Sequence, residues 1–280
     1  MTQLPGALHD EAIGRIAGFS VGITGIDIRD NKEVAYQSGS GTLVNLDGAL
    51  CIVTADHVIE DIMRRDRIGL LTDWHGGLRR CVFDRNHLRF VRLGRGDVVA
   101  DGPDLGAILL PDSGEAIASL KSHKVFYDLG QRVARFSTGY LPLEEGVWMP
   151  CGVLGEGSHA LPSTGGFDTV TGHWGMVGIA PAPDETLRDG FDYLELRGRP
   201  GVDPDMPGTF GGASGGGLWQ ARIARRADGS LALQEVILSG VIFYETAVKD
   251  GVRGLRCHGR ASVHERLVSA IRHCLSGGPD

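Results

Sequence analysis

Several features that would assign a chain to a particular class of protein are missing here. The N-terminus has no basic region followed by an apolar run, so no secretory leader is recognised, and no segment approaches the ~20 apolar residues of a membrane span. The net charge is −7, from 28 basic and 35 acidic residues. Because lysine and arginine supply much of the affinity for nucleic acids, this balance argues against a nucleic-acid partner. We therefore expect a cytoplasmic protein that binds neither membranes nor nucleic acids.

Cysteine and histidine also form no recognisable metal or redox pattern. The five cysteines are odd in number and widely spaced, without a CxxC pair, which disfavours a disulfide framework and a zinc knuckle. The histidines do not recur four residues apart on a helix beside a carboxylate, as they do in many zinc sites. We expect no metal and no cofactor. The densest basic segment, Arg222–Arg226, leads into Asp228-Gly229 and is interpreted as the edge of a hairpin.

Glycine, by contrast, is abundant. The chain has 43 glycines among 280 residues, about twice the usual share of ~7%, and they follow no period. Short apolar runs, about twelve in number, are separated by turn residues such as Asp47-Gly48. Helical spacing is found at residues 7–17 and 261–274, and briefly after His57 and at residues 116–120; residues 133–140 are interpreted as a strand. The pattern indicates an all-β chain of two barrels with short N-terminal and C-terminal helices.

A break in the strand pattern divides the chain. We expect five segments: a helical lead-in at 1–18, a first β-barrel at 19–112, a linker at 113–124, a second β-barrel at 125–260, and a C-terminal helix and tail at 261–280.

The strongest local motif is the glycine-rich loop Gly211–Gly217 around Ser214. A hydroxyl nucleophile needs a nearby base and a backbone curled so that its amides point at a developing oxyanion. Glycines on both sides of the serine permit that curl, because they adopt positive φ without steric cost. The amides of Gly212 and Ser214 are the natural donor pair. A tight turn between two strands is the alternative interpretation of the same loop.

Other glycine-loop chemistries fit less well. A P-loop would end in Gly-Lys-Ser/Thr, and a dinucleotide loop would lead into a helix, whereas Gly217 is followed by strand-like Leu218-Trp219. The loop also fits the G-x-S-x-G elbow of α/β-hydrolases. In that fold the acid and the histidine follow the serine, and only 66 residues (280 − 214) remain after Ser214.

Two further segments carry groups suited to catalysis. His57 follows an apolar strand at 50–53, and Asp104 opens the apolar run 105–110, where a carboxylate would orient an imidazole. Asp97 and Asp101 are nearby alternatives, and each residue taken alone is also explained as a surface or turn residue. The order His, Asp, Ser is that of the chymotrypsin class. Separations of 47 residues (104 − 57) and 110 residues (214 − 104) place the serine in the second half.

Four segments together resemble the successive motifs of bacterial trypsin-like serine peptidases, which have the chymotrypsin fold: Gly39-Ser-Gly-Thr-Leu-Val, Thr54-Ala-Asp-His-Val, Asp104-Leu-Gly-Ala-Ile-Leu and Gly212-Ala-Ser-Gly-Gly-Gly. The resemblance implies two perpendicular six-stranded antiparallel β-barrels. It also implies a serine endopeptidase that hydrolyses peptide bonds through an acyl-enzyme. By this resemblance Ser214 attacks, His57 is general base and then acid, and Asp104 orients His57. The amides of Gly212 and Ser214 would bind the oxyanion.

The same resemblance places the specificity pocket. Its floor would lie at Gly208, six residues before the serine (214 − 208), and its wall would come from the strand that includes Phe243, Tyr244 and Glu245. Gly208 brings no charge, while Glu245 would either narrow the pocket or attract a basic side chain.

The chain departs from the family at its activation signals. Ala213 stands where members activated by cleavage carry an aspartate, and there is no Ile-Val-Gly-Gly start. We therefore expect no activation by N-terminal insertion, and a regulatory partner protein is a hypothesis taken from the family. The expected substrate is a protein or peptide. Two other functions stay open at this stage. One is a catalytically silent trypsin-like binding module, and the other is an esterase-type hydrolase that uses His258 or His264 in place of His57.

Overall fold

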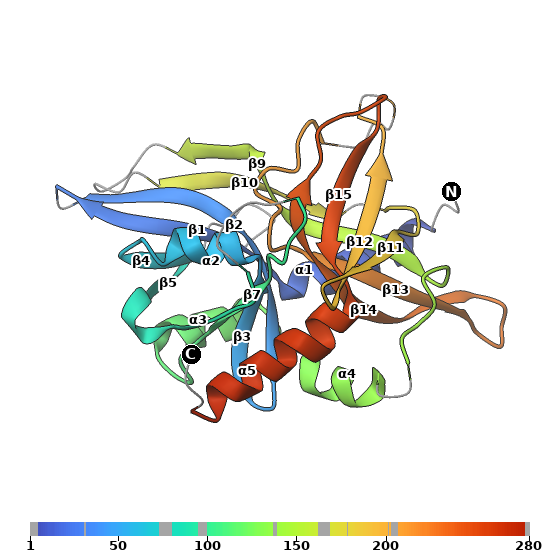
Figure 1. Cartoon of the computed structure of the whole chain (residues 1–280), viewed down its shortest axis with the longest axis horizontal. Helices are drawn as coiled ribbons and strands as arrows, with labels where there is room; N and C mark the ends of the chain where they lie inside the picture. The colour runs from blue at the N-terminus through green and yellow to red at the C-terminus, as the bar shows by residue number, and fades with distance from the viewer. Residues whose placement is uncertain are drawn as a thin grey trace.

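Two β-sheets make up most of the molecule (Figure 1). The computed structural model describes residues 5–30, 32–72, 80–94, 100–136, 139–161, 169–177, 179–200, 202 and 207–277. The prediction of a mostly β chain is confirmed. The described strands form one sheet of eight and one of seven strands, and the expected closed six-stranded barrels stay a prediction.

The first sheet has the strand order β5-β4-β1-β2-β3-β7-β6, with β8 pairing in parallel to β2. Its strands are β1 (Ser20–Arg29), β2 (Lys32–Leu46), β3 (Ala49–Thr54), β4 (Arg67–Leu71), β5 (Arg80–Asp84), β6 (Arg89–Arg92), β7 (Gly106–Leu109) and β8 (Tyr127–Asp128). The second sheet has the order β10-β9-β13-β14-β15-β12-β11. Its strands are β9 (Val147–Leu161), β10 (Thr169–Val177), β11 (Asp184–Arg188), β12 (Phe191–Gly198), β13 (Gly217–Arg225), β14 (Leu231–Glu245) and β15 (Arg253–His258).

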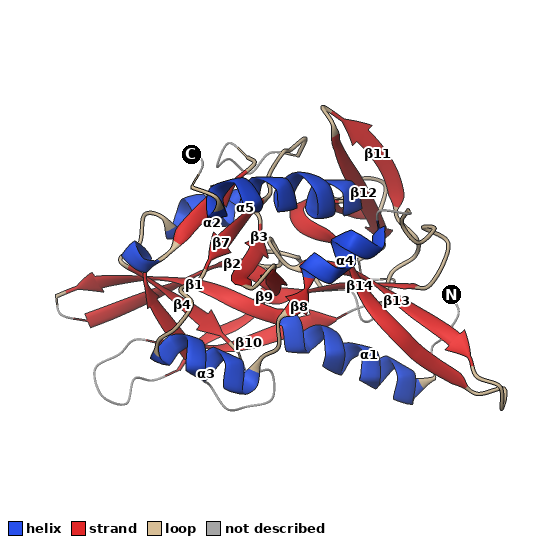
Figure 2. Ribbon diagram, turned by 90° about the horizontal axis from the view of Figure 1, so that it is seen from below, coloured by secondary structure: helices blue, strands red, loops and turns tan. Residues whose placement is uncertain are grey.

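Helices lie on the outside of the sheets. They are α1 (Gly6–Phe19), α2 (Asp56–Ile62), α3 (Glu115–His123), α4 (Leu129–Phe136) and α5 (Val268–Leu275), with the 3₁₀ turn η1 (Arg85–His87) and the π-helical segment η2 (Ser262–Leu267). Figure 2 shows α1 and α3 along one side of the sheets and α5 along the opposite side. The helices at the two ends agree with the sequence pattern. None of the helices among the described residues is long and apolar enough to cross a membrane.

Strand β3 explains why the sequence pattern there is a continuous apolar run. Side chains alternate across a strand. Cys51 and Val53 belong to one buried cluster, while Leu50 and Ile52 belong to another. Because both faces of β3 are covered, all four positions are apolar. The hairpin between β2 and β3 turns at Asp47-Gly48, as expected, with φ of 54° and 97°.

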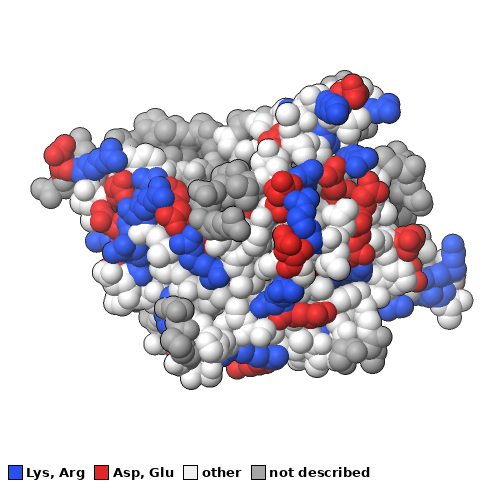
Figure 3. All heavy atoms as spheres, in the orientation of Figure 1, with Lys and Arg blue, Asp and Glu red and all other residues white. Residues whose placement is uncertain are grey.

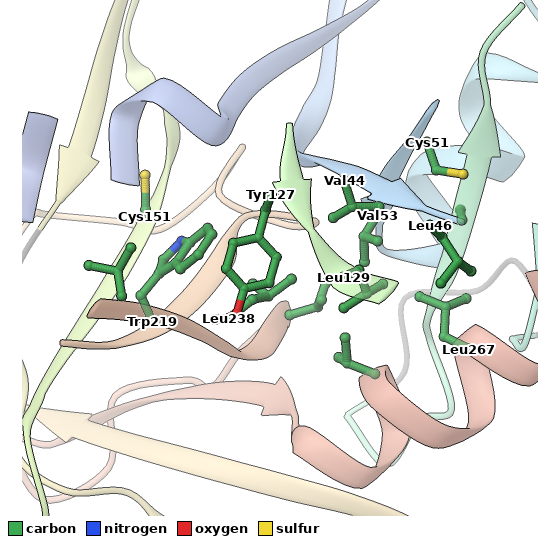
Figure 4. Close-up of a cluster of buried hydrophobic side chains, with 14 of the residues drawn as sticks. Val44, Leu46, Cys51, Val53, Tyr127, Leu129, Cys151, Trp219, Leu238 and Leu267 are labelled. Atoms are coloured by element: carbon green, nitrogen blue, oxygen red, sulfur yellow. Dashed lines mark hydrogen bonds between the residues drawn. The ribbon is translucent and has the colours of Figure 1, made fainter. Parts of the chain in front are cut away.

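One buried cluster joins the two sheets (Figure 4). It contains Val44, Leu46 and Val53 from the first sheet and Trp219 and Leu238 from the second. Helices α1 and α5 also contribute to it. The two halves of the chain therefore share one core, and the contact between them is a packed interior.

The prediction of a strand at residues 133–140 is wrong. Residues 129–136 form helix α4 instead, and residues 137–138 lie outside the described part of the chain. The carboxylate of Asp128 accepts a hydrogen bond from the backbone N–H of Gln131, as a helix cap does. Arg132 and Arg135, one turn apart, both bind Glu235 of β14. This ion-pair contact with a distant strand outweighs the local apolar pattern.

Candidate active site

His57 and Asp104 form a close pair beside the end of β3 and the start of β7. The Nδ1 atom of His57 lies 2.5 Å from Oδ2 of Asp104, and the backbone N–H of His57 donates to Oδ1 at 2.9 Å. An ionised carboxylate only accepts hydrogen bonds, so Nδ1 carries the proton of this bond and Nε2 is the acceptor nitrogen of the neutral ring. Asp104 is 1% exposed and the His57 side chain 14% exposed. One carboxylate thus fixes both the position and the tautomer of the histidine.

Helix α2, which carries His57, is fixed to β6 by a buried ion pair. Asp56 is fully buried and accepts bonds from Nε and Nη2 of Arg92, at 2.7 and 3.0 Å. Arg92 also contacts Glu60 on the same helix at 2.7 Å. The hydrogen bonds to Asp56, and then those to Glu60, raise the pKa of Arg92 above its ordinary value. The bidentate geometry holds the first turn of α2, and with it His57, in one orientation.

The Ser214 loop is bound to β2 through Ser40. The backbone N–H of Ser40 donates to the carbonyl of Ser214 at 2.7 Å, and its hydroxyl donates to the carbonyl of Gly212 at 2.8 Å. That hydroxyl also accepts from the N–H of Val153 on β9. Ser40 therefore connects the serine loop to strands of both sheets. Sequence reasoning included Ser40 in a motif but gave it no role.

Gly39 marks the point where α2 and the serine loop approach each other most closely across β2. A Cβ atom at Gly39 would lie 2.6 Å from Cγ2 of Val58 and 2.7 Å from the carbonyl oxygen of Ser214. Val58 follows His57 in α2. Val58, the neighbour of His57, and the Ser214 backbone therefore lie on either side of Gly39, with no room for a side chain between them.

Two amides of the serine loop are unused. The N–H groups of Gly211, Ala213, Gly215 and Gly216 donate to the hydroxyl of Thr209 and to the carbonyls of Phe210, Ile242 and Ala213, respectively. Within this described loop, the amides of Gly212 and Ser214 donate no hydrogen bond. Gly212 has φ of 90° and Gly215 has φ of 88°. The loop thus leaves two amide donors, one of them on Ser214, for an external acceptor.

The residues proposed for the specificity pocket are held in a local network. Glu245 accepts bonds from the Thr209 hydroxyl at 2.9 Å and the Phe210 amide at 3.0 Å, and pairs with Arg253 at 3.0 Å. Arg253 also donates to the carbonyl of Gly208. The charge of Glu245 is therefore compensated within the protein. Because its charge is already paired, Glu245 is poorly suited to attract a basic side chain of a substrate, which is one of the two roles expected for it.

Phe243 and Tyr244, adjacent on β14, differ in how deeply they are buried. The Phe243 side chain is fully buried against the rings of Tyr193 and His258. Tyr244 is half-buried and packs against the same cluster. Of the two side chains, Tyr244 is therefore the one with surface for a bound substrate.

The alternative catalytic residues that the structure describes do not take the place of His57 or Asp104 in this pair. Asp101 is 70% exposed and bound to Arg188 at 2.7 Å, and Asp97 lies outside the described residues. His264 is buried, with Nε2 on the carbonyl of Leu238. His258 is buried behind Asp104, whose amide donates to it. The described residues contain no group of three or more His, Cys, Asp or Glu side chains placed to hold a metal ion.

Comparison with known proteins gave a resemblance in structure but none in sequence. No known protein family and no curated protein matches the sequence. Among solved structures, the chain is similar to the active form of the Rv3671c protease from M. tuberculosis. The match covers 96% of this chain and 88% of that chain, with 11% sequence identity and a TM-score of 0.45.

Proposed function

We propose that the chain is a serine endopeptidase of the trypsin-like kind, with His57, Asp104 and Ser214 as its catalytic triad. Two observations support the proposal: the hydrogen bond between His57 and the buried Asp104, and a serine loop in which the amides of Gly212 and Ser214 donate no hydrogen bond. A buried carboxylate on Nδ1 prepares the imidazole to accept a proton at Nε2. Unused amides flanking a serine are what an oxyanion requires.

The reaction follows from these roles. His57 Nε2 accepts the proton of the Ser214 hydroxyl as its oxygen attacks the peptide carbonyl. Asp104 stabilises the imidazolium that forms, and the amides of Gly212 and Ser214 donate to the oxyanion. His57 then protonates the leaving amine, and an acyl-enzyme remains on Ser214. Water, deprotonated by His57, hydrolyses that ester and restores the enzyme.

Labelling with a fluorophosphonate probe tests the proposal directly. Wild type is expected to form an adduct that peptide mapping locates on Ser214. Ser214→Ala and His57→Ala should abolish it. Asp104→Asn should slow labelling by up to about 10⁴-fold, because the wrong tautomer of His57 is then favoured.

Asp250→Asn serves as the matched control for Asp104→Asn, since Asp250 lies in an exposed turn of the second half. It should label at the wild-type rate. Labelling that persists in His57→Ala would contradict the triad. A folded wild type that neither labels nor cleaves peptides would favour the catalytically silent module.

A further inference from the structure

A second buried histidine lies directly behind the triad aspartate. The backbone N–H of Asp104 donates to Nε2 of His258 at 2.9 Å, and His258 is fully buried. Because Nε2 is the acceptor, the ring proton is on Nδ1. No partner for Nδ1 is found among the described residues, and aromatic rings surround it. An unsatisfied buried polar atom is uncommon in native proteins and needs an explanation.

His258 is one of several residues of the second sheet that contact residues 100–104, the segment that ends at Asp104. Residues 100–104 lead into β7 of the first sheet, yet several of their contacts are with β11, β12 and β15 of the second. Arg256, two residues before His258 on β15, donates to the carbonyl of Ala100 at 2.7 Å. Tyr193 of β12 packs so closely that a Cβ on Gly102 would lie 2.8 Å from its ring. The second sheet thus determines where the aspartate of the first sheet lies.

The contacts with this segment differ in strength. Arg188 and Arg256 both pair with Asp101, which is 70% exposed. Figure 3 shows that basic and acidic side chains lie side by side on the surface of the molecule. Exposed ion pairs contribute little to positioning because water screens them. The hydrogen bond to His258 is buried and adjoins the catalytic carboxylate in sequence. Burial also lowers the pKa of His258 to about 3, so its ring stays neutral and keeps an acceptor at Nε2.

We propose that His258 is a positioning residue for catalysis: its Nε2 fixes the backbone of Asp104, and thereby aims the carboxylate at His57. This inference rests on the proposed function. It explains why the fold tolerates an unpartnered Nδ1, since the ring must be neutral and oriented to accept at Nε2. It also explains why both sheets are needed to place the acid of the triad.

Two substitutions of His258 test the positioning role, with a third variant as their control. His258→Phe keeps an aromatic ring but removes the acceptor, whereas His258→Gln places an amide oxygen at a similar reach. We expect His258→Phe to lower kcat on the order of 10- to 100-fold for a quenched fluorescent peptide cleaved by wild type, since a displacement of about 1 Å can cost about 100-fold. KM should stay within about twofold, because substrate contacts are untouched. His258→Gln should restore most of kcat.

His264→Phe is the matched control. It also removes a buried histidine with one backbone hydrogen bond, but that bond is to Leu238 and does not involve Asp104. It should reduce thermal stability without changing kcat. The proposal is overturned if His258→Phe keeps the wild-type kcat, or if His264→Phe lowers kcat as much as His258→Phe does.

A measurement on wild type covers the case in which His258→Phe does not fold. The Asp104 amide should exchange with deuterium as slowly as the β7 amides. At about pH 5, where an ordinary histidine is charged, ¹⁵N spectra should show His258 as a neutral ring protonated at Nδ1, distinct from His264, whose neutral ring is protonated at the Nε2 that donates to Leu238. Fast exchange at Asp104 would overturn the proposal. If wild type does not label at Ser214, the proposed function fails, and this measurement still decides whether His258 holds Asp104.

Discussion

At the residue scale, Gly215 is the position where the serine loop has least room. Its φ is 88°, and an added Cβ would overlap the Thr54 hydroxyl and the carbonyl of Ser40. Gly215→Ala should lower the free energy of unfolding by about 1 kcal/mol for the backbone conformation and by a further ~2–3 kcal/mol for overlap. It should also slow labelling of Ser214, because the loop must shift. Urea unfolding and labelling rates measure the two effects.

Gly229 provides the comparison. Its φ is 83°, and nothing lies within 4 Å of an added Cβ. Gly229→Ala should therefore show only the backbone cost of about 1 kcal/mol and label normally. Equal losses of stability in the two variants would mean that the serine loop is not tightly packed.

Part of the proposed site can be recognised in the sequence because its signal is local. Glycines around a serine, and a histidine and an aspartate at strand ends, can be recognised from neighbouring residues. Ser40 and His258 could not be assigned roles in this way. Ser40 acts on Gly212, 172 residues away, and His258 acts on Asp104, 154 residues away. Contacts of that kind depend on how the sheets meet, which no local pattern encodes.

At the scale of elements, the C-terminal helical segment contains a buried histidine that makes it sensitive to acid. His264 in η2 is 1% exposed. Burial lowers its pKa from the ordinary value of 6.5 to about 4, against the opposing influence of Leu238, Asp192 and Glu265. Between these values the unfolded chain binds a proton that the folded chain does not. This contribution to stability is complete above about pH 6.5 and is lost as the pH falls toward 4.

His264→Gln removes that titration while its amide can still donate to Leu238. The free energy of unfolding of wild type, measured relative to that of the variant, should therefore fall by about 3 kcal/mol from pH 7 to pH 4, at about 1.4 kcal/mol per pH unit. Urea unfolding across this range measures the difference. A difference that stayed constant from pH 7 to pH 4 would show that folding does not shift the pKa of His264, and would contradict this prediction.

The sequence predicted those helices and turns in which the spacing of apolar residues shows the full period of the element. The terminal helices and the Asp47-Gly48 hairpin are examples. Helix α4 was missed because only Leu129 of its residues is buried. Its stabilising contacts are arginines bound to Glu235, about 100 residues away. A polar contact of this kind leaves no hydrophobic period in the sequence.

At the scale of the whole molecule, the shared core makes the two sheets one cooperative unit. Trp219 packs between Phe19 of α1 and Tyr127 of β8, with ring centroids 5.4 and 5.3 Å apart. The Tyr127 hydroxyl in turn accepts from the Leu238 amide on β14. The proposed triad spans the same boundary, since its acid and base lie in the first half and its serine in the second. Opening one sheet would therefore expose the core of the other and separate the triad.

Native-state hydrogen exchange tests this cooperativity. Leu46 in the first sheet and Leu238 in the second are both fully buried in the shared cluster. Leu46→Ala and Leu238→Ala should each lower the opening free energy of β3 and β14 together, by about 3 kcal/mol, because either cavity weakens one common core. Leu187→Ala, at a 77% exposed side chain on β11, should change neither strand. If each variant instead loosened only its own sheet, the halves would open independently, and the triad would assemble by docking of two separately stable units.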